Sequence, residues 1–399
     1  MSVNLKSEHL KMAESLVDET RSLGGLAPVD LERFWRDQEV AQKDPFGAQI
    51  PQVAFGALLN WECVFDELGI PQDFKRYEDD PPWRYRLNRA YNDLSERIVG
   101  RRLLDETPPE KQPEAFRGPK ELHELFEGMN VWEPGSQSWW LQKSAHSEAE
   151  LRALLDRVER RLEDPRAFFL PPDWDATKKR LLSQGRKVPA YGWQRGPVTL
   201  AMSLFGVEEL IYLIEDEPDL ASRFRDLILK GILAKWRLHG EEAGHSPHAR
   251  PRGFHFNDDN CAMLNAPMYE AFGFPILKGV WEVTSPDPKD RRTQHSDSDM
   301  AHLLPLLGRL DLNWTNFGPN VMVDAIRLHL PHAVIYGELA PFTYSRNEET
   351  NMVAEFLRDH ELTRVERGLH FATAGSINNG SRLTGMRLLM AAIQRWGRF

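Results

Sequence analysis

Short apolar runs alternate with longer stretches of helical spacing along most of the sequence, and the apolar runs tend to end in polar residues. Each apolar run is predicted to be a strand, and each stretch after it a helix. Repeated strand–helix units are typical of parallel α/β proteins, and eight units predict a (β/α)8 TIM barrel, in which functional groups lie at the carboxyl ends of the strands. The predicted strands are residues 51–59, 130–132, 189–195, 253–258, 290–295, 312–317, 333–338 and 370–375.

The pattern also predicts how the chain is divided. Residues 1–48 are predicted to form an N-terminal helical extension, with Asp30 placed to cap a helix over residues 31–42. Residues 49–399 are predicted to form a single barrel. Within it, residues 70–185 are expected to be a mainly helical elaboration, because they are rich in proline, charged residues and tryptophan.

Composition narrows the class of protein. Hydrophobic residues make up 41% of the 399 positions and charged residues 28%, which is ordinary for a globular protein with a sizeable core. The net charge of -10 argues against nucleic acid as a partner, and no apolar run reaches the ~20 residues of a membrane span. Only two cysteines are present, and no secretory signal is visible at the N-terminus, so we expect a cytoplasmic protein.

The first cluster of candidate residues ends the predicted strand 253–258. Strand alternation sends His255, Asn257 and Asp259 to one face and Asp258 to the other. Asp258 and Asp259 are candidate catalytic groups, because adjacent carboxyl groups at a barrel mouth can differ in pKa and share acid and base work. The alternative is that one of them caps the following helix or a turn.

The second cluster ends the next predicted strand. His295 and Asp297 are two residues apart, so both can face one ligand or metal ion if the strand extends that far. Histidine with a carboxylate suits zinc or iron. The alternative is that Asp297 or Ser298 caps the next helix, while His295 is hydrogen-bonded inside the barrel.

Other strand ends offer groups for binding. Glu338 ends the strand 333–338 and is a candidate catalytic residue, with a salt bridge to Arg346 as the structural alternative. Asn316 and Asn378 offer neutral donors and acceptors to a substrate, or else satisfy turns.

The strand 189–195 adds two candidates, an anion site and an aromatic wall. Arg195 directly precedes a predicted helix N-terminus, an arrangement that favours an anion, although a solvated arginine explains it as well. Trp193, with Trp139 and Trp140, is a candidate for lining an aromatic substrate pocket. Core packing accounts for the tryptophans equally well.

Several stretches resemble the uroporphyrinogen decarboxylase superfamily, which includes cobamide-dependent methyltransferases. The resemblance covers residues 50–399 and supports the barrel fold. It rests on the motif Gly196-Pro197-x-Thr199-Leu200-Ala201, the stretch 208–218 (EELIYLIEDEP), Asp258-Asp259 followed by 266–269 (APMY), His295, and the stretch 336–341 (YGELAP).

The resemblance breaks at the residues that define each branch of the superfamily. Asn60, nine residues before Gly69, stands where the decarboxylases carry a catalytic aspartate, and is here a candidate for substrate binding. The methyltransferases bind zinc through His-x-Cys and a later cysteine. Here His295 matches, Asp297 stands at the first cysteine position and Ser376 at the later one. With these changes we expect a harder metal site of His295, Asp297 and Glu338, which suits an oxygen-bearing substrate.

Three functions remain open from the sequence. The first is methyl transfer from a small oxygenated or aromatic donor to a corrinoid protein, with zinc or another divalent metal, or no metal, and with Asp258 or Asp259 as proton donor or substrate anchor. The second is a cofactor-free decarboxylase or lyase acting on a polycarboxylate, in which Asp259 and His295 move the proton. The third is a non-catalytic barrel that binds a small ligand. A homodimer is left open.

Overall fold

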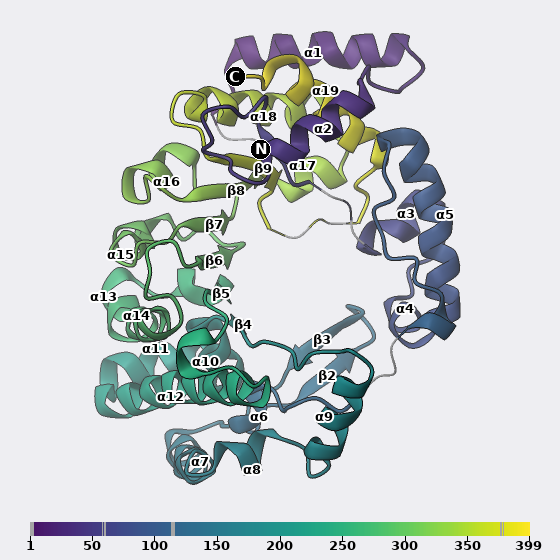
Figure 1. The fold of residues 1–399 in the computed structure, drawn as a ribbon. Coiled ribbons are helices and arrows are strands. Elements are labelled where there is room, and N and C mark those ends of the chain that lie inside the picture. Colours follow the sequence, from purple (N-terminus) through teal and green to yellow (C-terminus); the bar gives the residue numbers. More distant parts are fainter. Residues whose placement is uncertain (1–3, 58, 60, 113–115, 376, 378) are drawn as a thin grey trace. The chain divides into compact units, whose positions relative to one another are not determined.

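The computed structural model describes residues 4–57, 59, 61–112, 116–375, 377 and 379–399 (Figure 1). The chain forms two compact units. One contains residues 114–313. The other contains residues 1–113 together with residues 314–399.

The unit of residues 114–313 is built on three parallel strands. These are β4 (Trp193–Arg195), β5 (Phe254–Asn257) and β6 (Arg292–Ser296), in the spatial order β4-β5-β6. Each is followed by helix, as the sequence pattern predicts. The helices of this unit are α6 (Leu122–Leu125), α7 (Glu148–Arg161), α8 (Pro165–Phe169), α9 (Trp174–Ser183), α10 (Pro197–Phe205), α11 (Val207–Asp216), α12 (Pro218–Glu242), α13 (Ala266–Ala271), α14 (Gly273–Thr284) and α15 (Leu304–Gly308).

Residues alternate along β5 between a buried and a partly exposed face. Phe254 and Phe256 are buried, and the ring of Phe256 lies 5.6 Å from that of Trp281 on α14, edge to face. His255 and Asn257 are partly exposed on the opposite face. The apolar face therefore packs on the helix layer, and the polar face is left for a site.

The segment predicted as the second barrel strand has another partner. Residues 130–132 do form a strand, β2 (Asn130–Glu133), but it pairs antiparallel with β3 (Ser138–Leu141) in a two-stranded hairpin. In the hairpin Trp132 lies opposite Trp139, with ring centroids 5.4 Å apart. The helical elaboration predicted over residues 70–185 thus includes a hairpin, because paired aromatic side chains stabilise neighbouring strands there.

The second unit is built on four parallel strands. They are β1 (Ala54–Phe55), β7 (Trp314–Phe317), β8 (Val334–Leu339) and β9 (Leu369–Thr373), in the spatial order β1-β9-β8-β7. Its helices are α1 (Ser7–Ser22), α2 (Leu31–Ala41), α3 (Val64–Leu68), α4 (Phe74–Asp79), α5 (Pro81–Val99), α16 (Val323–His329), α17 (Pro341–Ser345), α18 (Glu349–Thr363) and α19 (Leu383–Trp396).

The N-terminal helices form as predicted. The Asp30 side chain accepts a hydrogen bond from the backbone nitrogen of Arg33 and so caps α2. Helix α1 packs on α18, which in turn packs on β8 and β9. As a result α18 is buried along most of its length, including its charged residues Glu355, Arg358 and Asp359.

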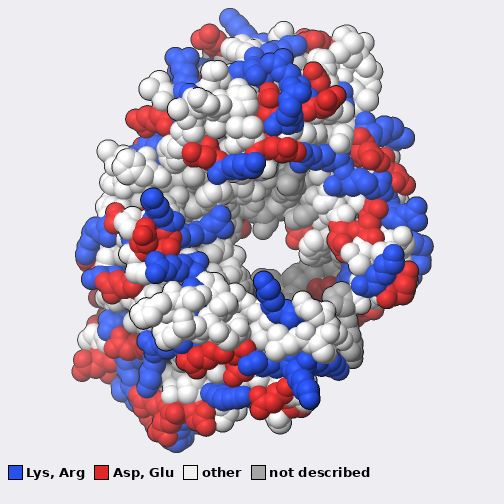
Figure 2. All heavy atoms as spheres, in the orientation of Figure 1, with Lys and Arg blue, Asp and Glu red and all other residues white. Residues whose placement is uncertain are grey.

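Seven of the eight predicted barrel strands are therefore parallel strands in the structure, three in one unit and four in the other. The fold is parallel α/β. Closure of the strands into one cylinder, and the division into an extension and a single barrel, stay predictions. Among the described residues no single helix is long and apolar enough to cross a membrane; only α10 and α11 together, bent by 104°, have the length and composition. On the face shown in Figure 2, basic and acidic residues are intermixed.

Candidate functional site

Two rows of residues across β4, β5 and β6 define one face of these strands. Parallel pairing sets Trp193 beside His255, and two residues further along it sets Arg195 beside Asn257, and Asn257 beside His295. Paired residues of neighbouring strands project to the same face. The face that alternation predicts for His255 and Asn257 therefore also carries an arginine, a tryptophan and a second histidine.

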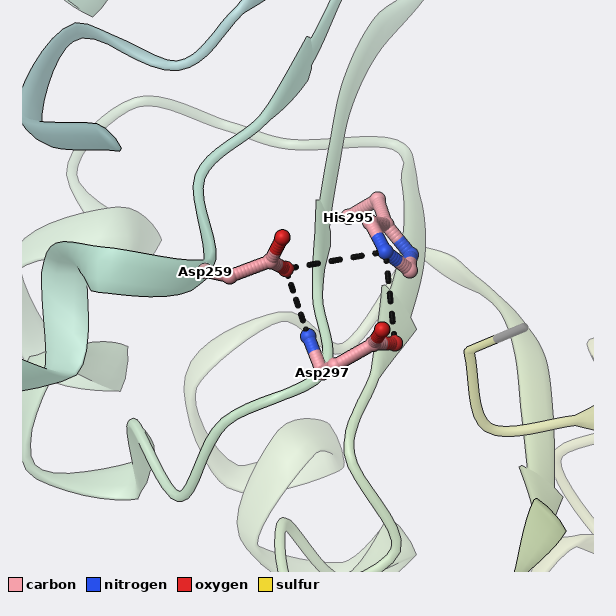
Figure 3. Close-up of side chains that lie close together, drawn as sticks. All are labelled: Asp259, His295 and Asp297. Atoms are coloured by element: carbon pink, nitrogen blue, oxygen red, sulfur yellow. Dashed lines mark hydrogen bonds and ion pairs between the residues drawn. The ribbon is translucent and has the colours of Figure 1, made fainter. Parts of the chain in front are cut away.

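A compact cluster of one imidazole and two carboxylates lies where β5 and β6 end (Figure 3). Nε2 of His295 lies 3.3 Å from Oδ1 of Asp297 and 3.6 Å from Oδ1 of Asp259. The backbone nitrogen of Asp297 donates to the same Asp259 oxygen at 2.8 Å. One ligand atom from each residue lies within 4.8 Å of the other two. The structure thus brings together His295, Asp297 and Asp259, which the sequence places in two separate clusters.

Local structure fixes this arrangement. Asp259 begins a 3-10 helix, Asp259–Met263, that turns the chain directly after β5. The Ser298 hydroxyl donates to the backbone oxygen of Asp259, which ties the segment after β6 to the segment after β5. Asp297 and Ser298 are occupied in these contacts. The helix predicted after this strand is short: a 3-10 turn, Ala301–Leu303, precedes α15.

The three groups of the cluster influence one another's charge. Burial raises the pKa of Asp297, and the neighbouring Asp259 carboxylate raises it further, while His295 opposes the change. Two carboxylates held this close repel each other, so a positive charge between them is stabilising. Oxygen and imidazole ligands suit Zn²⁺, Mn²⁺ or Fe²⁺.

Asp258 has a different place from its neighbour. It is fully buried, on the opposite side from Asp259, and its Oδ1 accepts a hydrogen bond of 2.8 Å from the backbone nitrogen of Thr199. It therefore anchors the first turn of α10, although burial raises the pKa of its carboxyl group to about 6. Gly196 permits this contact, because a Cβ there would lie 2.1 Å from Cβ of Asp258. Asp258 thus caps α10, the helix after β4, and not the helix that follows its own strand, as the structural alternative expected.

A cavity of about 380 Å³ adjoins the cluster within the unit of residues 114–313. Its size is within the usual range of small-molecule sites. The cavity reaches the cluster at Asp259. Its other walls come from β3, β4, α10 and the end of β5: Ser138, Trp139, Trp140, Leu141, Trp193, Arg195, Thr199, Ser203, Asn257 and Asn260.

Several of these wall residues, among them Ser138, Leu141, Thr199 and Ser203, were not singled out from the sequence for a site. Thr199 and Ser203 lie one turn apart on α10, and the Thr199 hydroxyl accepts a hydrogen bond from the backbone nitrogen of Asn260. The spacing of four between Thr199 and Ser203, shortly after Arg195, is the sequence feature that could have indicated these two residues. Nothing in the sequence indicated that the β2–β3 hairpin supplies one of the walls.

His255 lies two residues before Asn257 on the same face of β5, beside Trp193 of β4. Burial lowers the pKa of its imidazole to about 4, a hydrogen bond with Asn257 opposes the shift, and the nearby His295 adds to it. At neutral pH the ring is therefore neutral, which suits a hydrogen-bonding rather than a charged role.

The remaining candidates belong to the other unit or lie outside the described residues. Glu338 is fully buried on β8, and burial raises its pKa well above the ordinary range, with Asp359 adding to the shift. Arg346 pairs with Glu348 instead. Asn316 donates to the backbone oxygens of two neighbouring strands, at Tyr336 and Thr373, and so braces β7, β8 and β9.

Three positions used in the sequence argument, Asn60, Ser376 and Asn378, lie outside the described residues. The role of Asn60 and Asn378 in a site stays a prediction, and so does a role for Glu338 beside His295.

Comparison with known proteins identifies the fold. No family model and no curated protein matches the chain. Among solved structures, a methyltransferase from Methanosarcina mazei aligns with a TM-score of 0.53 and 15% sequence identity, over 90% of this chain and 98% of that chain. The chain therefore has an α/β fold similar to that of a methyltransferase. The similarity extends over nearly the whole length of both proteins.

Proposed function

We propose that the protein is a methyltransferase that moves a methyl group from the oxygen of a small donor to a corrinoid protein, with a divalent metal ion bound by Asp259, His295 and Asp297. The observation that carries this proposal is the cluster itself: three ligand atoms from three residues within 4.8 Å of one another, next to a cavity of small-molecule size. The fold shared with a methyltransferase supports it.

The residues of the cluster fit a hard cation better than a soft one. Both cysteines of the chain, Cys63 and Cys261, are buried and neither belongs to the cluster. With carboxylates in place of thiolates, an oxygen donor is a better match than a thiol. A divalent cation bound there supplies Lewis-acid stabilisation of negative charge on an oxygen.

The chain's own groups then have distinct tasks. Asp259 and Asp297 balance the cation's charge, and the Asp297 backbone nitrogen holds Asp259 in position. Asn257 and Asn260 line the adjoining cavity and offer neutral hydrogen bonds to the donor. In the transfer the O–CH3 bond breaks with its electron pair on the oxygen, the methyl group bonds to the nucleophilic cobalt of the corrinoid, and the oxygen takes up a proton from solvent.

The test is a methyl-transfer assay with reduced corrinoid as acceptor, in which methylcobalt formation is followed by absorbance. Zinc-, manganese- and iron-loaded protein is presented with methyl ethers and with methanol. We expect activity with one metal, its loss in His295→Ala, and unchanged activity in His245→Ala, a solvent-exposed control. Equal activity in both variants would remove the cluster from the reaction.

The second candidate function is a decarboxylase or lyase. It is favoured by the same contact geometry, since an imidazole touching two carboxylates can pass a proton to a substrate carbon. Release of CO2 from polycarboxylic acids by metal-free protein, lost in His295→Ala, would select this reading over methyl transfer.

A further inference from the structure

The cavity beside the cluster has an unusually aromatic wall for a solvent-facing site. The indoles of Trp139, Trp140 and Trp193 line it, and they are 46%, 59% and 51% exposed. Trp139 is held edge to face by Trp132, and Nε1 of Trp140 donates to the Ser136 hydroxyl at 2.9 Å. Large indole surfaces left open around a cavity are typical of a binding site for a flat apolar group, because core packing would have covered them.

The same cavity contains a half-buried arginine without a charged partner close by. Nη1 of Arg195 donates to the Ser203 hydroxyl at 3.1 Å. Within the described part of the chain, no carboxylate oxygen lies within 4.0 Å of its guanidinium; Asp259 acts on it only at longer range. Burial lowers the pKa of Arg195, yet arginine remains charged in proteins.

An unpaired, partly desolvated charge is costly unless a ligand supplies the counterion. Ser203 itself is fixed by a hydrogen bond of 2.7 Å to the backbone oxygen of Thr199, so the guanidinium is held at Nη1 while Arg195 lines the cavity. A planar guanidinium matches a planar carboxylate with two parallel hydrogen bonds.

We propose that the methyl donor is an aromatic ether bearing a carboxylate, with its ring against the tryptophan wall and its carboxylate on Arg195. This assignment rests on the proposed methyl transfer and specifies its substrate. Asp259 belongs both to the cavity and to the cluster, so a donor bound in this way has its ether oxygen near the cluster.

A quaternary ammonium group is the competing occupant of an aromatic wall. It is disfavoured because Arg195, on the same wall, repels a cation. A small zwitterion such as glycine betaine would still satisfy both the indoles and the guanidinium, so it serves as a competing probe.

The experiment is a binding measurement by calorimetry on the full chain, with and without added zinc. The probes are 4-methoxybenzoate, its neutral counterpart 4-methoxybenzamide, and glycine betaine. We expect the benzoate to bind at least about tenfold more tightly than the benzamide, the usual worth of a charge-assisted hydrogen bond. In Arg195→Met this preference disappears, while Arg195→Lys keeps part of it and Arg346→Met, an exposed control, keeps all of it.

Removing one indole tests the aromatic part separately. Trp140→Leu is expected to weaken benzoate and benzamide by a similar factor, because both share the ring. Thermal melting of each variant confirms that it is folded. An equal affinity for benzoate and benzamide, a preference that survives in Arg195→Met, or tight binding of glycine betaine with none of 4-methoxybenzoate would each overturn the assignment.

The outcome also separates this inference from the proposed function. If 4-methoxybenzoate binds with the expected dependence on Arg195 but no 4-hydroxybenzoate forms with corrinoid present, the cavity assignment stands and the methyl transfer fails. If methyl transfer proceeds with neutral donors alone, the proposed function stands and the assignment of a carboxylate to Arg195 fails.

Discussion

Nε2 of His295 lies 3.3 Å from Oδ1 of Asp297, two residues further along the chain and just past the end of β6. Strand alternation places two such residues on one face, and here both remain beside the end of β5, where Asp259 completes the group. A pair that is local in sequence thereby becomes part of a three-residue cluster.

Gly196 is predicted to be indispensable for joining β4 to α10. A Cβ at this position would lie 2.1 Å from Cβ of Asp258, which anchors the first turn of the helix. Gly196→Ala should therefore destabilise the protein by about 1 to 3 kcal/mol, the cost of overpacking. Urea denaturation followed by circular dichroism measures the loss. The matched control is Gly118→Ala, where the nearest atom is 3.9 Å from the added carbon and we expect a change within about 0.5 kcal/mol.

Breaking the buried ion pair of α18 is predicted to lower the free energy of unfolding far more than breaking a surface pair. Arg358 donates to Asp359 at 2.6 and 3.0 Å, and both residues are buried. Arg358→Met leaves a carboxylate without its partner in the core, which should cost about 3 kcal/mol. Lys75→Met breaks an exposed pair with Asp79 and should cost about 0.5 kcal/mol or less. Equal losses in the two variants would mean that α18 is more hydrated than its burial indicates.

A buried histidine should make stability depend on pH. His370 lies among Trp314 and Tyr336, and burial lowers its pKa to about 4. The unfolded chain takes up a proton on this histidine near pH 6.5, while the folded chain does not until about pH 4, so stability is lost as the pH falls between these values. From pH 7.5 to 4.5 the contribution is about 2 to 3 kcal/mol.

The measurement is denaturation of wild type and His370→Phe at both pH values. The phenylalanine keeps an aromatic ring but cannot be protonated. On acidification from pH 7.5 to 4.5 the variant should therefore lose about 2 to 3 kcal/mol less stability than wild type. His245→Gln, at an exposed position, should behave as wild type. A wild-type slope in His370→Phe would show that this residue is not the source.

Much of the fold follows from patterns that are local in the sequence. The apolar runs predicted the strands because alternation and helix caps are local properties, as Asp30 at the start of α2 illustrates. The partner of a strand is not local. Residues 130–132 have the composition of a strand, but only the tertiary structure shows that Trp139 of β3, and no parallel strand, lies beside them.

The candidate site was predictable to the same degree. The face shared by His255 and Asn257, and the opposite direction of Asp258, follow from alternation along β5. The meeting of Asp259 with His295 does not, because it depends on the pairing of β5 with β6 and on the 3-10 turn that begins at Asp259. That Asp259 joins His295 and Asp297 required coordinates for the same reason.

The most direct test of the account is calorimetric titration of metal-stripped protein with Zn²⁺ and Mn²⁺. We predict a single ion per chain, with affinity at least about tenfold lower in Asp259→Asn and in Asp297→Asn, since losing a ligand should cost no less than losing one of its supporting partners. Asp219→Asn, at an exposed position outside the cluster, should bind as wild type does. Absence of binding, or the same affinity in all variants, would contradict a metal site at Asp259, His295 and Asp297.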